Sequence, residues 1–202
     1  LSNQIVSTKI DSVLSDNEKN DTIEIDKKIW QIHNKYIITE ITSGLVIIDQ
    51  HVAHERVLYE TAIKAIEGDG LNSQKILFPQ TLTFTSDEFE HLFDIFLYLK
   101  KIGFDLRKFG DTDIIIEGVP AELPIGREAD IINDILDNYI EHKKINSSFI
   151  DYIAATYACK AAIKAGEKLS NVECSELLDQ LFNTEHPYYC PHGRPIIINL
   201  TI

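Results

Sequence analysis

Residues 45–60 of the chain read LVIIDQHVAHERVLYE, and this stretch organises the rest of the sequence. Its first four residues are branched and apolar, which favours a buried β-strand. From Val52 onward apolar residues recur at helical spacing as far as Ile66. Asp49 stands between the two patterns, where its carboxylate can cap the first turn of a helix. The stretch therefore predicts a buried strand that leads directly into a helix.

The start of this predicted helix carries candidate metal ligands. His51 and Glu55 are one helical turn apart, which places them on one face at roughly 6 Å along the axis. An imidazole and a carboxylate so placed can hold one metal ion, and Asp49 at the helix mouth can join them. A solvated helix face often shows the same spacing, so these residues alone leave both interpretations open.

Further candidate ligands come from the end of the chain. Residues 190–195 read CPHGRP, and the two prolines stiffen a turn that presents a thiol and an imidazole. Cys159 adds a second thiol from a segment of helical composition, although by itself it would be interpreted as a small buried hydrophobic residue, as Cys174 is. The whole set suits zinc or manganese better than calcium or magnesium; it comprises Asp49, His51, Glu55, Cys159, Cys190 and His192.

These segments carry a family resemblance. Residues 49–60 resemble the DQHA(x)2E(x)4E motif of the C-terminal domain of MutL-type DNA mismatch-repair proteins. Residues 158–160 and 190–195 resemble that family's ACR and CPHGRP motifs, and the resemblance runs from about Thr22 to Ile202. Val52 replaces an alanine of the pattern, which leaves every ligand in place. Lys160 replaces an arginine, which keeps the charge but loses the planar guanidinium.

The resemblance implies a homodimer that nicks duplex DNA and is stimulated by the replicative sliding clamp. Zn²⁺ or Mn²⁺, as one ion or as a pair, would be held by the six-residue set, with Asp49, His51 and Glu55 as the catalytic members. Three further residues would orient ligands or contact phosphate, namely Glu60, Lys160 and Arg194.

Two other function classes use the same residues. A non-catalytic module that dimerises and docks partners would hold one structural zinc in a closed site of four protein ligands. A metallopeptidase is less well supported, because residues 51–55, HVAHE, match neither the HExxH nor the HxxEH order.

Composition and net charge limit the range of functions that the chain could have. The 202 residues, 44% of them hydrophobic, suffice for a substantial core, and no run approaches the roughly 18 apolar residues of a membrane span. Three cysteines without regular spacing do not form a disulfide framework, which indicates a reducing compartment. The net charge of −13 argues against tight DNA binding by this piece alone, so we expect weak nicking from it in isolation.

The chain has no methionine, even at position 1, and we interpret it as a fragment of a longer protein. The resemblance then implies a bacterial cytoplasmic protein. ATP and the mismatch-recognition protein would be engaged only through an absent N-terminal region.

The remaining patterns predict an α+β fold in two subdomains, preceded by a polar linker remnant at residues 1–21. Residues 22–73 and 150–202 should form a dimerisation subdomain with the metal site. Its expected elements are an antiparallel meander, a helix from Ser148 to about Lys164, a last helix capped by Ser170 or Asn171, and a final strand. Because that strand, residues 195–202, is apolar on both faces, we expect it to be central or covered.

Residues 74–149 should form an inserted regulatory subdomain. It is expected to contain a helix from Ser86, a hairpin over residues 104–119 and a helix from Arg127 to His142. The aromatic stripe of the first helix, which includes Phe89, Phe93 and Phe96, is expected to lie in the core.

Residues 74–79, QKILFP, are expected to form a partly extended peptide with exposed apolar side chains that ends at a proline. Such a peptide can fill an apolar groove on a partner. Gln74, Leu77 and Pro79 match the QxxLxP clamp-binding peptide of endonuclease-type MutL proteins, which implies the sliding clamp as partner. The alternative is a strand that enters the inserted subdomain.

Overall fold

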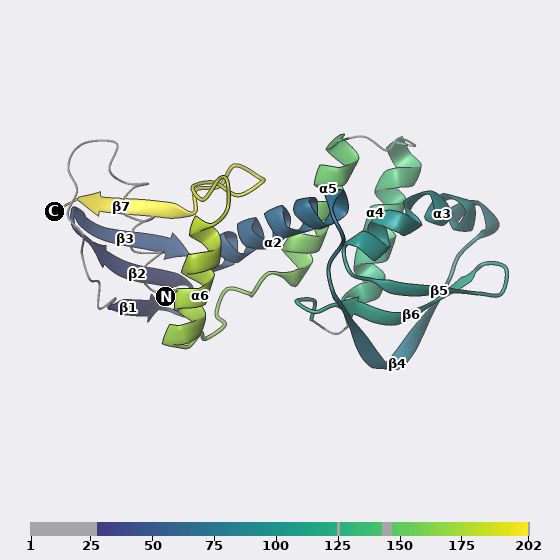
Figure 1. The fold of residues 1–202 in the computed structure, drawn as a ribbon, viewed down its shortest axis with the longest axis horizontal. Helices are drawn as coiled ribbons and strands as arrows, with labels where there is room; N and C mark the ends of the chain where they lie inside the picture. The colour runs from purple at the N-terminus through teal and green to yellow at the C-terminus, as the bar shows by residue number, and fades with distance from the viewer. Residues whose placement is uncertain (1–27, 125, 143–146, 202) are drawn as a thin grey trace. The chain divides into compact units, whose positions relative to one another are not determined.

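A computed structural model describes residues 28–124, 126–142 and 147–201. The predicted linker at residues 1–21 and the expected start of the meander at Thr22 lie outside this part. The described chain has an α+β fold with two antiparallel sheets and five helices, which confirms the predicted fold class (Figure 1). No helix among the described residues is long and apolar enough to cross a membrane. The chain divides into two compact units, one over Leu1–Val57 and Ile163–Ile202 and the other over Leu58–Ala162.

The first unit contains a four-stranded sheet in the order β1-β2-β3-β7. Its strands are β1 (Ile29–Ile32), β2 (Tyr36–Ile41), β3 (Gly44–Asp49) and β7 (Ile197–Thr201), each antiparallel to its neighbour. The predicted meander and the predicted strand before Asp49 are therefore confirmed. α2 (Gln50–Glu67) follows β3 without a loop, as the sequence predicts.

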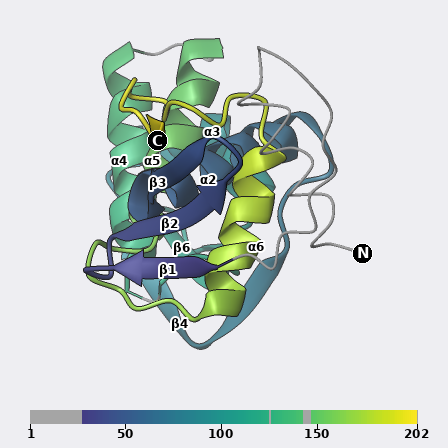
Figure 2. The same ribbon diagram turned by 90° about the vertical axis from the view of Figure 1, so that its left-hand side faces the viewer.

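One face of this sheet forms the core of the first unit. Ile37, Val46 and Ile48 are completely buried there and belong to one apolar cluster with the start of α2. α6 (Asn171–Phe182) completes that cluster through its apolar side, and Figure 2 shows this helix alongside the strands. Ser170 caps α6, as predicted, in a reciprocal pairing with Glu173.

The other face of the sheet is also apolar. The strand register aligns Trp30, Ile38, Ile47 and Ile198 in one row across the four strands, because directly paired residues point to the same face. Ile198 is 52% exposed and Leu200 is 47% exposed. We expected the last strand to be central or covered, but within the described residues β7 lies at an edge of the sheet. The apolar side chains of β7 on this face are therefore about half exposed.

The second unit contains a three-stranded sheet in the order β4-β6-β5 and three helices. The strands are β4 (Ser73–Thr83), β5 (Asp105–Phe109) and β6 (Asp113–Pro120). The helices are α3 (Ser86–Lys101), α4 (Glu128–His142) and α5 (Ser147–Ala161). The predicted hairpin and both predicted helices are confirmed. α3 begins one residue after its cap, Thr85, which pairs with Glu88.

Two sequence expectations fail in detail. Phe93 of α3 is exposed, although Phe89 is buried as expected, because only one side of α3 packs on the core. α5 ends at Ala161 instead of Lys164. Helical bonding stops there because the N–H of Ile163 donates to the His54 ring instead of to the preceding helical turn.

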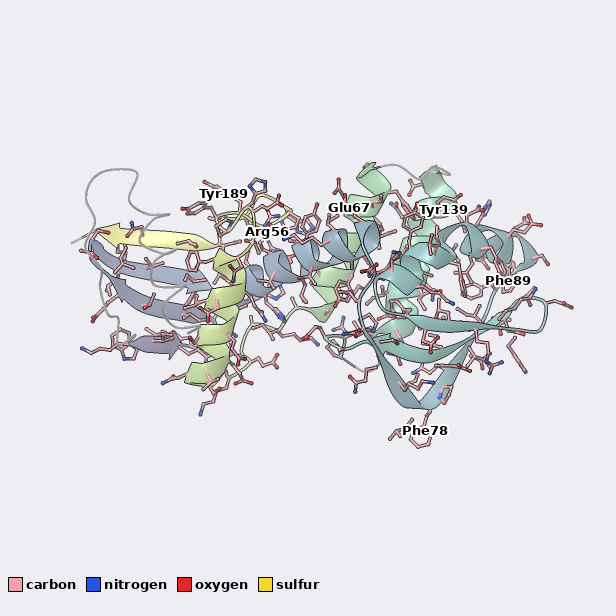
Figure 3. The ribbon with its side chains drawn as sticks, in the orientation of Figure 1. Arg56, Glu67, Phe78, Phe89, Tyr139 and Tyr189 are labelled. Atoms are coloured by element: carbon pink, nitrogen blue, oxygen red, sulfur yellow. The ribbon has the colours of Figure 1, made fainter. Side chains whose placement is uncertain are left out.

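Residues 74–79 lie within β4, where the pairing with β6 shifts between Lys75 and Gln80. Residues 76–79 therefore have no partner in the ladder with β6. Leu77 is 92% exposed and Phe78 is 85% exposed, and Figure 3 shows Phe78 pointing away from the bend of β4. The segment is thus both an irregular part of a strand and a peptide with exposed apolar side chains.

Candidate metal centre

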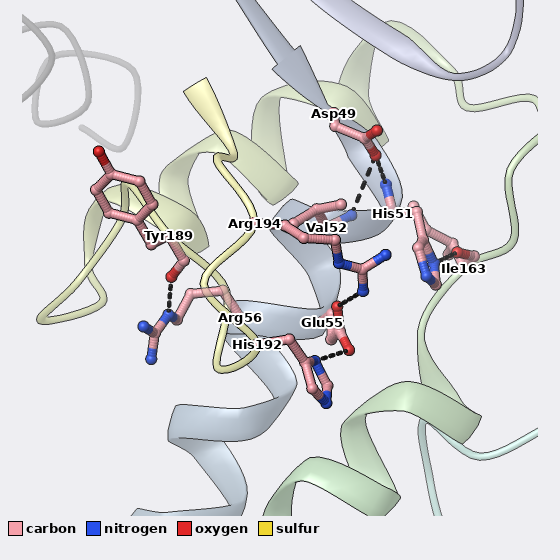
Figure 4. Close-up of polar contacts among 9 residues, drawn as sticks. All are labelled: Asp49, His51, Val52, Glu55, Arg56, Ile163, Tyr189, His192 and Arg194. Atoms are coloured by element: carbon pink, nitrogen blue, oxygen red, sulfur yellow. Dashed lines mark hydrogen bonds and ion pairs between the residues drawn. The ribbon is translucent and has the colours of Figure 1, made fainter. Parts of the chain in front are cut away.

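Asp49 fixes the start of α2. Its Oδ1 accepts hydrogen bonds from the main-chain N–H groups of His51 at 3.1 Å and Val52 at 3.2 Å (Figure 4). These are the second and third residues of the helix, so Asp49 serves as the helix cap. The capped start sets the positions of His51 and Glu55, one turn apart on the same helix.

The turn at residues 190–195 is held by main-chain hydrogen bonds. Cys190 N donates to Arg194 O at 3.0 Å, and Gly193 N donates to Cys190 O at 2.9 Å. Gly193 adopts a φ of 78°, a left-handed conformation in which glycine avoids the strain of a side chain. Arg56 Nε of α2 donates to Tyr189 O at 2.8 Å and thereby ties the turn to the helix. No sequence pattern indicates this contact, because a main-chain acceptor has no residue signature.

Glu55 lies at the centre of the site and is completely buried. Arg194 Nη2 lies 2.9 Å from Glu55 Oε2, and His192 Nδ1 lies 3.1 Å from Glu55 Oε1 (Figure 4). The second contact is close, but Oε1 has no hydrogen-bond partner among the described residues, so the imidazole is near without being aligned to donate. A buried carboxylate needs compensating charge, and here Arg194 supplies it from the turn.

Glu55, Cys190 and His192 together form a group that fits a metal ion. One ligand atom from each residue lies within 4.8 Å of the others. Cys190 is buried, whereas the His192 side chain is about half exposed, so the group faces solvent on one side. A buried carboxylate oxygen without a hydrogen bond, next to a thiol and an imidazole, is an arrangement that a divalent cation would satisfy.

His51 and His54 both bind the main chain of Ile163. His51 Nδ1 lies 2.7 Å from the Ile163 carbonyl oxygen, which can only accept, so Nδ1 is the donor and the lone pair of the neutral ring lies at Nε2. His54 Nδ1 accepts the Ile163 N–H at 3.0 Å, and burial lowers the pKa of His54 to about 4. The two rings therefore fasten the segment after α5 to α2, a role that the sequence did not reveal.

The other predicted site residues belong to the second unit. Cys159 is exposed on α5, and Lys160 Nζ lies 2.9 Å from Asp134 Oδ2. Glu60 is buried and pairs with Lys64 at 3.9 Å. Of the predicted set, the structure brings together Glu55, Cys190, His192 and Arg194. Asp49, the last residue of β3, and His51 of α2 make the contacts described above.

Comparison with protein families gives one match over most of the chain. Residues 29–169 match the model described as the MutL C terminal dimerisation domain. This range includes the capped start of α2 and Cys159.

Individual relatives extend the similarity to the terminal turn. The chain is 48% identical over 180 residues to the DNA mismatch repair protein MutL of Pelodictyon phaeoclathratiforme, covering 89% of this chain and 29% of that protein. It is 47% identical over 180 residues to MutL of Chlorobaculum tepidum, with the same two coverages. The similarity to MutL of Chlorobium limicola is 44% over 200 residues, covering 98% of this chain and 32% of the relative. The chain thus spans about three tenths of the length of the curated relatives it matches.

Proposed function

This chain belongs to the family of MutL C-terminal dimerisation domains, and from that premise we propose that it pairs with a second copy and nicks duplex DNA at a divalent metal centre. The observation that carries the proposal is the buried carboxylate of Glu55, whose Oε1 lacks a hydrogen bond beside the Cys190 thiol and the His192 imidazole.

The proposed centre uses Glu55, Cys190 and His192 as ligands, with Zn²⁺ or Mn²⁺ as the ion. Three protein ligands are the usual complement of a catalytic zinc site, whereas a structural site has four. A bound cation would polarise the scissile phosphodiester and lower the pKa of a bound water. The family resemblance extends the proposed ligand set to Asp49, His51 and Cys159. For His51, the lone pair at Nε2 supports this assignment.

The chain's own groups would prepare the site in three ways. Arg194 neutralises Glu55, and its half-exposed guanidinium is within reach of a substrate phosphate on the solvent side. The Ile163 carbonyl fixes the His51 tautomer, and Arg56 positions the turn that carries Cys190. Glu60 and Lys160 have ion-pair partners at Lys64 and Asp134, so we propose that they act on the site only through neighbouring residues.

Nicking of supercoiled plasmid tests the proposal. We expect relaxation that requires added Mn²⁺ and that the full-length protein performs better than this chain, because the net charge of −13 repels DNA. Glu55→Gln keeps the size of the side chain and removes its charge, and should reduce nicking at least about 100-fold. Glu67→Gln, an exposed change at the end of the same helix, is the matched control and should nick normally. Equal nicking by both variants would exclude Glu55 from the reaction.

The competing function is a dimerisation and docking module with one structural zinc. Its support is the burial of Cys190 and the ion pair that Arg194 already makes with Glu55. On this alternative, metal removal with a chelator should lower the Tm sharply, and Cys190→Ser should do the same, with no nicking to lose. A nickase whose metal binds a folded, preformed site should instead lose activity with little change in Tm.

We also propose that residues 74–79 bind the sliding clamp. Leu77 and Phe78 are almost fully exposed at the irregular part of β4, which supports a docking role. Gln74→Ala combined with Leu77→Ala should abolish clamp binding in a pull-down and leave metal content unchanged. Phe109→Ala, which truncates another exposed apolar residue of the same unit, is the control. Unchanged clamp binding by the double variant would contradict the proposal that residues 74–79 bind the clamp.

The remaining expectations concern the whole protein. We propose that ATP and the mismatch-recognition protein are engaged by parts of the protein outside this chain, which spans about three tenths of its relatives. We also propose that residues 22–73 and 150–202 form the dimerisation subdomain around residues 74–149 as an inserted regulatory subdomain. Bacterial relatives support a bacterial source, and we propose the cytoplasm as its compartment.

A further inference from the structure

A cavity of about 540 Å³ lies in the first unit. Its described lining residues do not include Glu55, Cys190 or His192, and they come from other elements. It lies beside β1, which in the described sheet is an edge strand, and beside the segment that leads into α6. The side chains relevant to its chemistry are Lys28, Trp30, Asn34, Lys168 and Asn171. No function assigned above uses these side chains.

The cavity is cationic in a strongly acidic chain. Its lining within residues 28–124, 126–142 and 147–201 contains no carboxylate, although the full chain has 32 acidic and 19 basic residues. Neither Lys28 nor Lys168 makes an ion pair with another described residue. The acidic side chains on either side of Lys168, Glu167 and Glu173, accept main-chain hydrogen bonds from Lys164 and Ser170. No described carboxylate therefore neutralises the two lysines, and their charge attracts anions.

Trp30 gives the cavity an aromatic wall. It is the only tryptophan of the chain and is 43% exposed. Trp30 belongs to the apolar open face through its row with Ile38, but it stands on the edge strand opposite to β7. An exposed indole beside two lysines offers a stacking surface next to a charge that attracts phosphate. The carboxamides of Asn34 and Asn171 add donors and acceptors of the kind that contact base edges.

We propose that this cavity binds a nucleotide unit of single-stranded DNA, with the base against Trp30 and the phosphate beside Lys28 and Lys168. The choice of DNA rests on the proposed nicking function, but binding here requires neither the metal nor Glu55. An acidic peptide would use the lysines and leave the indole without a planar partner, so the nucleotide makes fuller use of the cavity.

The fluorescence of Trp30 tests the proposal directly, because no other tryptophan contributes to the signal. We expect an eight-residue oligothymidylate to quench it saturably at about 50 mM salt and to bind more weakly as salt rises. Lys28→Glu and Lys168→Glu should each weaken binding about tenfold or more. Lys100→Glu, the same charge change at an exposed lysine of α3 in the other unit, is the matched control and should bind normally. Circular dichroism checks that each variant folds.

The other outcomes are equally decisive. Absence of quenching at low salt, or identical binding by both cavity variants and the control, would overturn the proposal. Equal quenching by polyglutamate would overturn it in favour of an acidic peptide. Binding of thymidine monophosphate as tightly as the oligomer would support a nucleotide site but assign it to free nucleotides instead of a strand. Glu55→Gln should bind the oligomer normally, so a failure of nicking and a failure of this site are separable.

Discussion

At the scale of single residues, the decisive feature is the burial of a charge. Glu55 is completely buried, and the two groups nearest to its carboxylate, Arg194 and His192, come from the other end of the chain. Removing one member of a buried pair typically costs about 3–5 kcal/mol, because the remaining charge stays buried. Both partners of Glu55 are about half exposed, so solvent reduces that cost here. The fold tolerates the buried Glu55 carboxylate because the turn at residues 190–195 places Arg194 beside it.

His54 gives a pH dependence of stability. Its pKa is lowered from 6.5 to about 4 because the ring is buried while it accepts the Ile163 N–H. Between pH 4 and 6.5 the unfolded chain binds a proton at this residue that the folded chain does not bind, so acid favours unfolding. The stabilisation is fully present above the unfolded pKa and is lost as the pH falls. We expect His54 to account for a loss of about 2 kcal/mol between pH 7 and pH 5.

Urea unfolding of the metal-free chain at the two pH values measures this effect. His54→Gln provides an acceptor for the Ile163 N–H that does not titrate, so its stability should change about 2 kcal/mol less over the same interval. His33→Gln, at an exposed turn residue, is the control for histidine loss in general. The attribution to His54 would fail if both variants kept the wild-type pH dependence.

At the scale of elements, α2 and its cap set the spacing of the candidate ligands. Asp49 joins β3 to α2, and its Oδ1 accepts the N–H groups of His51 and Val52. The cap therefore decides where the helix begins and which face carries Glu55. Strand and helix are both visible in the local sequence, because the hydrophobic period changes from a continuous apolar run to helical spacing at this residue.

Substitutions at Asp49 separate its capping role from its proposed role as a ligand. Asp49→Ala should destabilise the chain by about 1 kcal/mol, because two N–H groups lose their acceptor. Asp49→Ser retains a good cap and should remain close to wild-type stability in thermal unfolding. If Asp49 also binds metal, both variants should lose nicking. A serine variant as unstable as the alanine variant would show that the carboxylate does more for folding than capping.

At the scale of the whole molecule, the open face of the four-stranded sheet is the main unexplained apolar surface. Ile198 and Leu200 of β7 are exposed on it, and Ile47 of β3 lies in the same row as Ile198. A contiguous apolar patch of this kind marks an interaction surface in soluble proteins. The family is described as a dimerisation domain, which supports a second copy of the chain as the occupant.

We expect Ile198→Glu combined with Leu200→Glu to weaken the dimer by at least about 100-fold, since each buried apolar side chain is worth about 1.5–3 kcal/mol. Light scattering after size-exclusion chromatography should then report a monomer with unchanged circular dichroism. Leu97→Glu, at an exposed residue of α3, is the control and should remain dimeric. A double variant that stays dimeric would place the interface elsewhere.

Local sequence patterns are enough to predict the helices and strands and the residue types of the candidate site. The change of hydrophobic period at Asp49, the capping residue Ser170 and the CPHGRP turn are local signals, and the structure confirms the elements that they predict. The sequence also indicated that Glu55, Cys190, His192 and Arg194 belong to one candidate site. Such signals can be recognised in the sequence because each depends on residues that are only a few positions apart.

The contacts between these parts are visible only in the folded structure. It placed Arg194 and His192 on Glu55, tied Arg56 to the Tyr189 carbonyl, and used the main chain of Ile163 to hold His51 and His54. It also left Ile198 and Phe93 exposed where an apolar pattern predicted burial. A main-chain partner carries no residue signature, and an apolar side chain is the same residue whether a core or a partner covers it. These outcomes depend on long-range packing, which the local pattern does not encode.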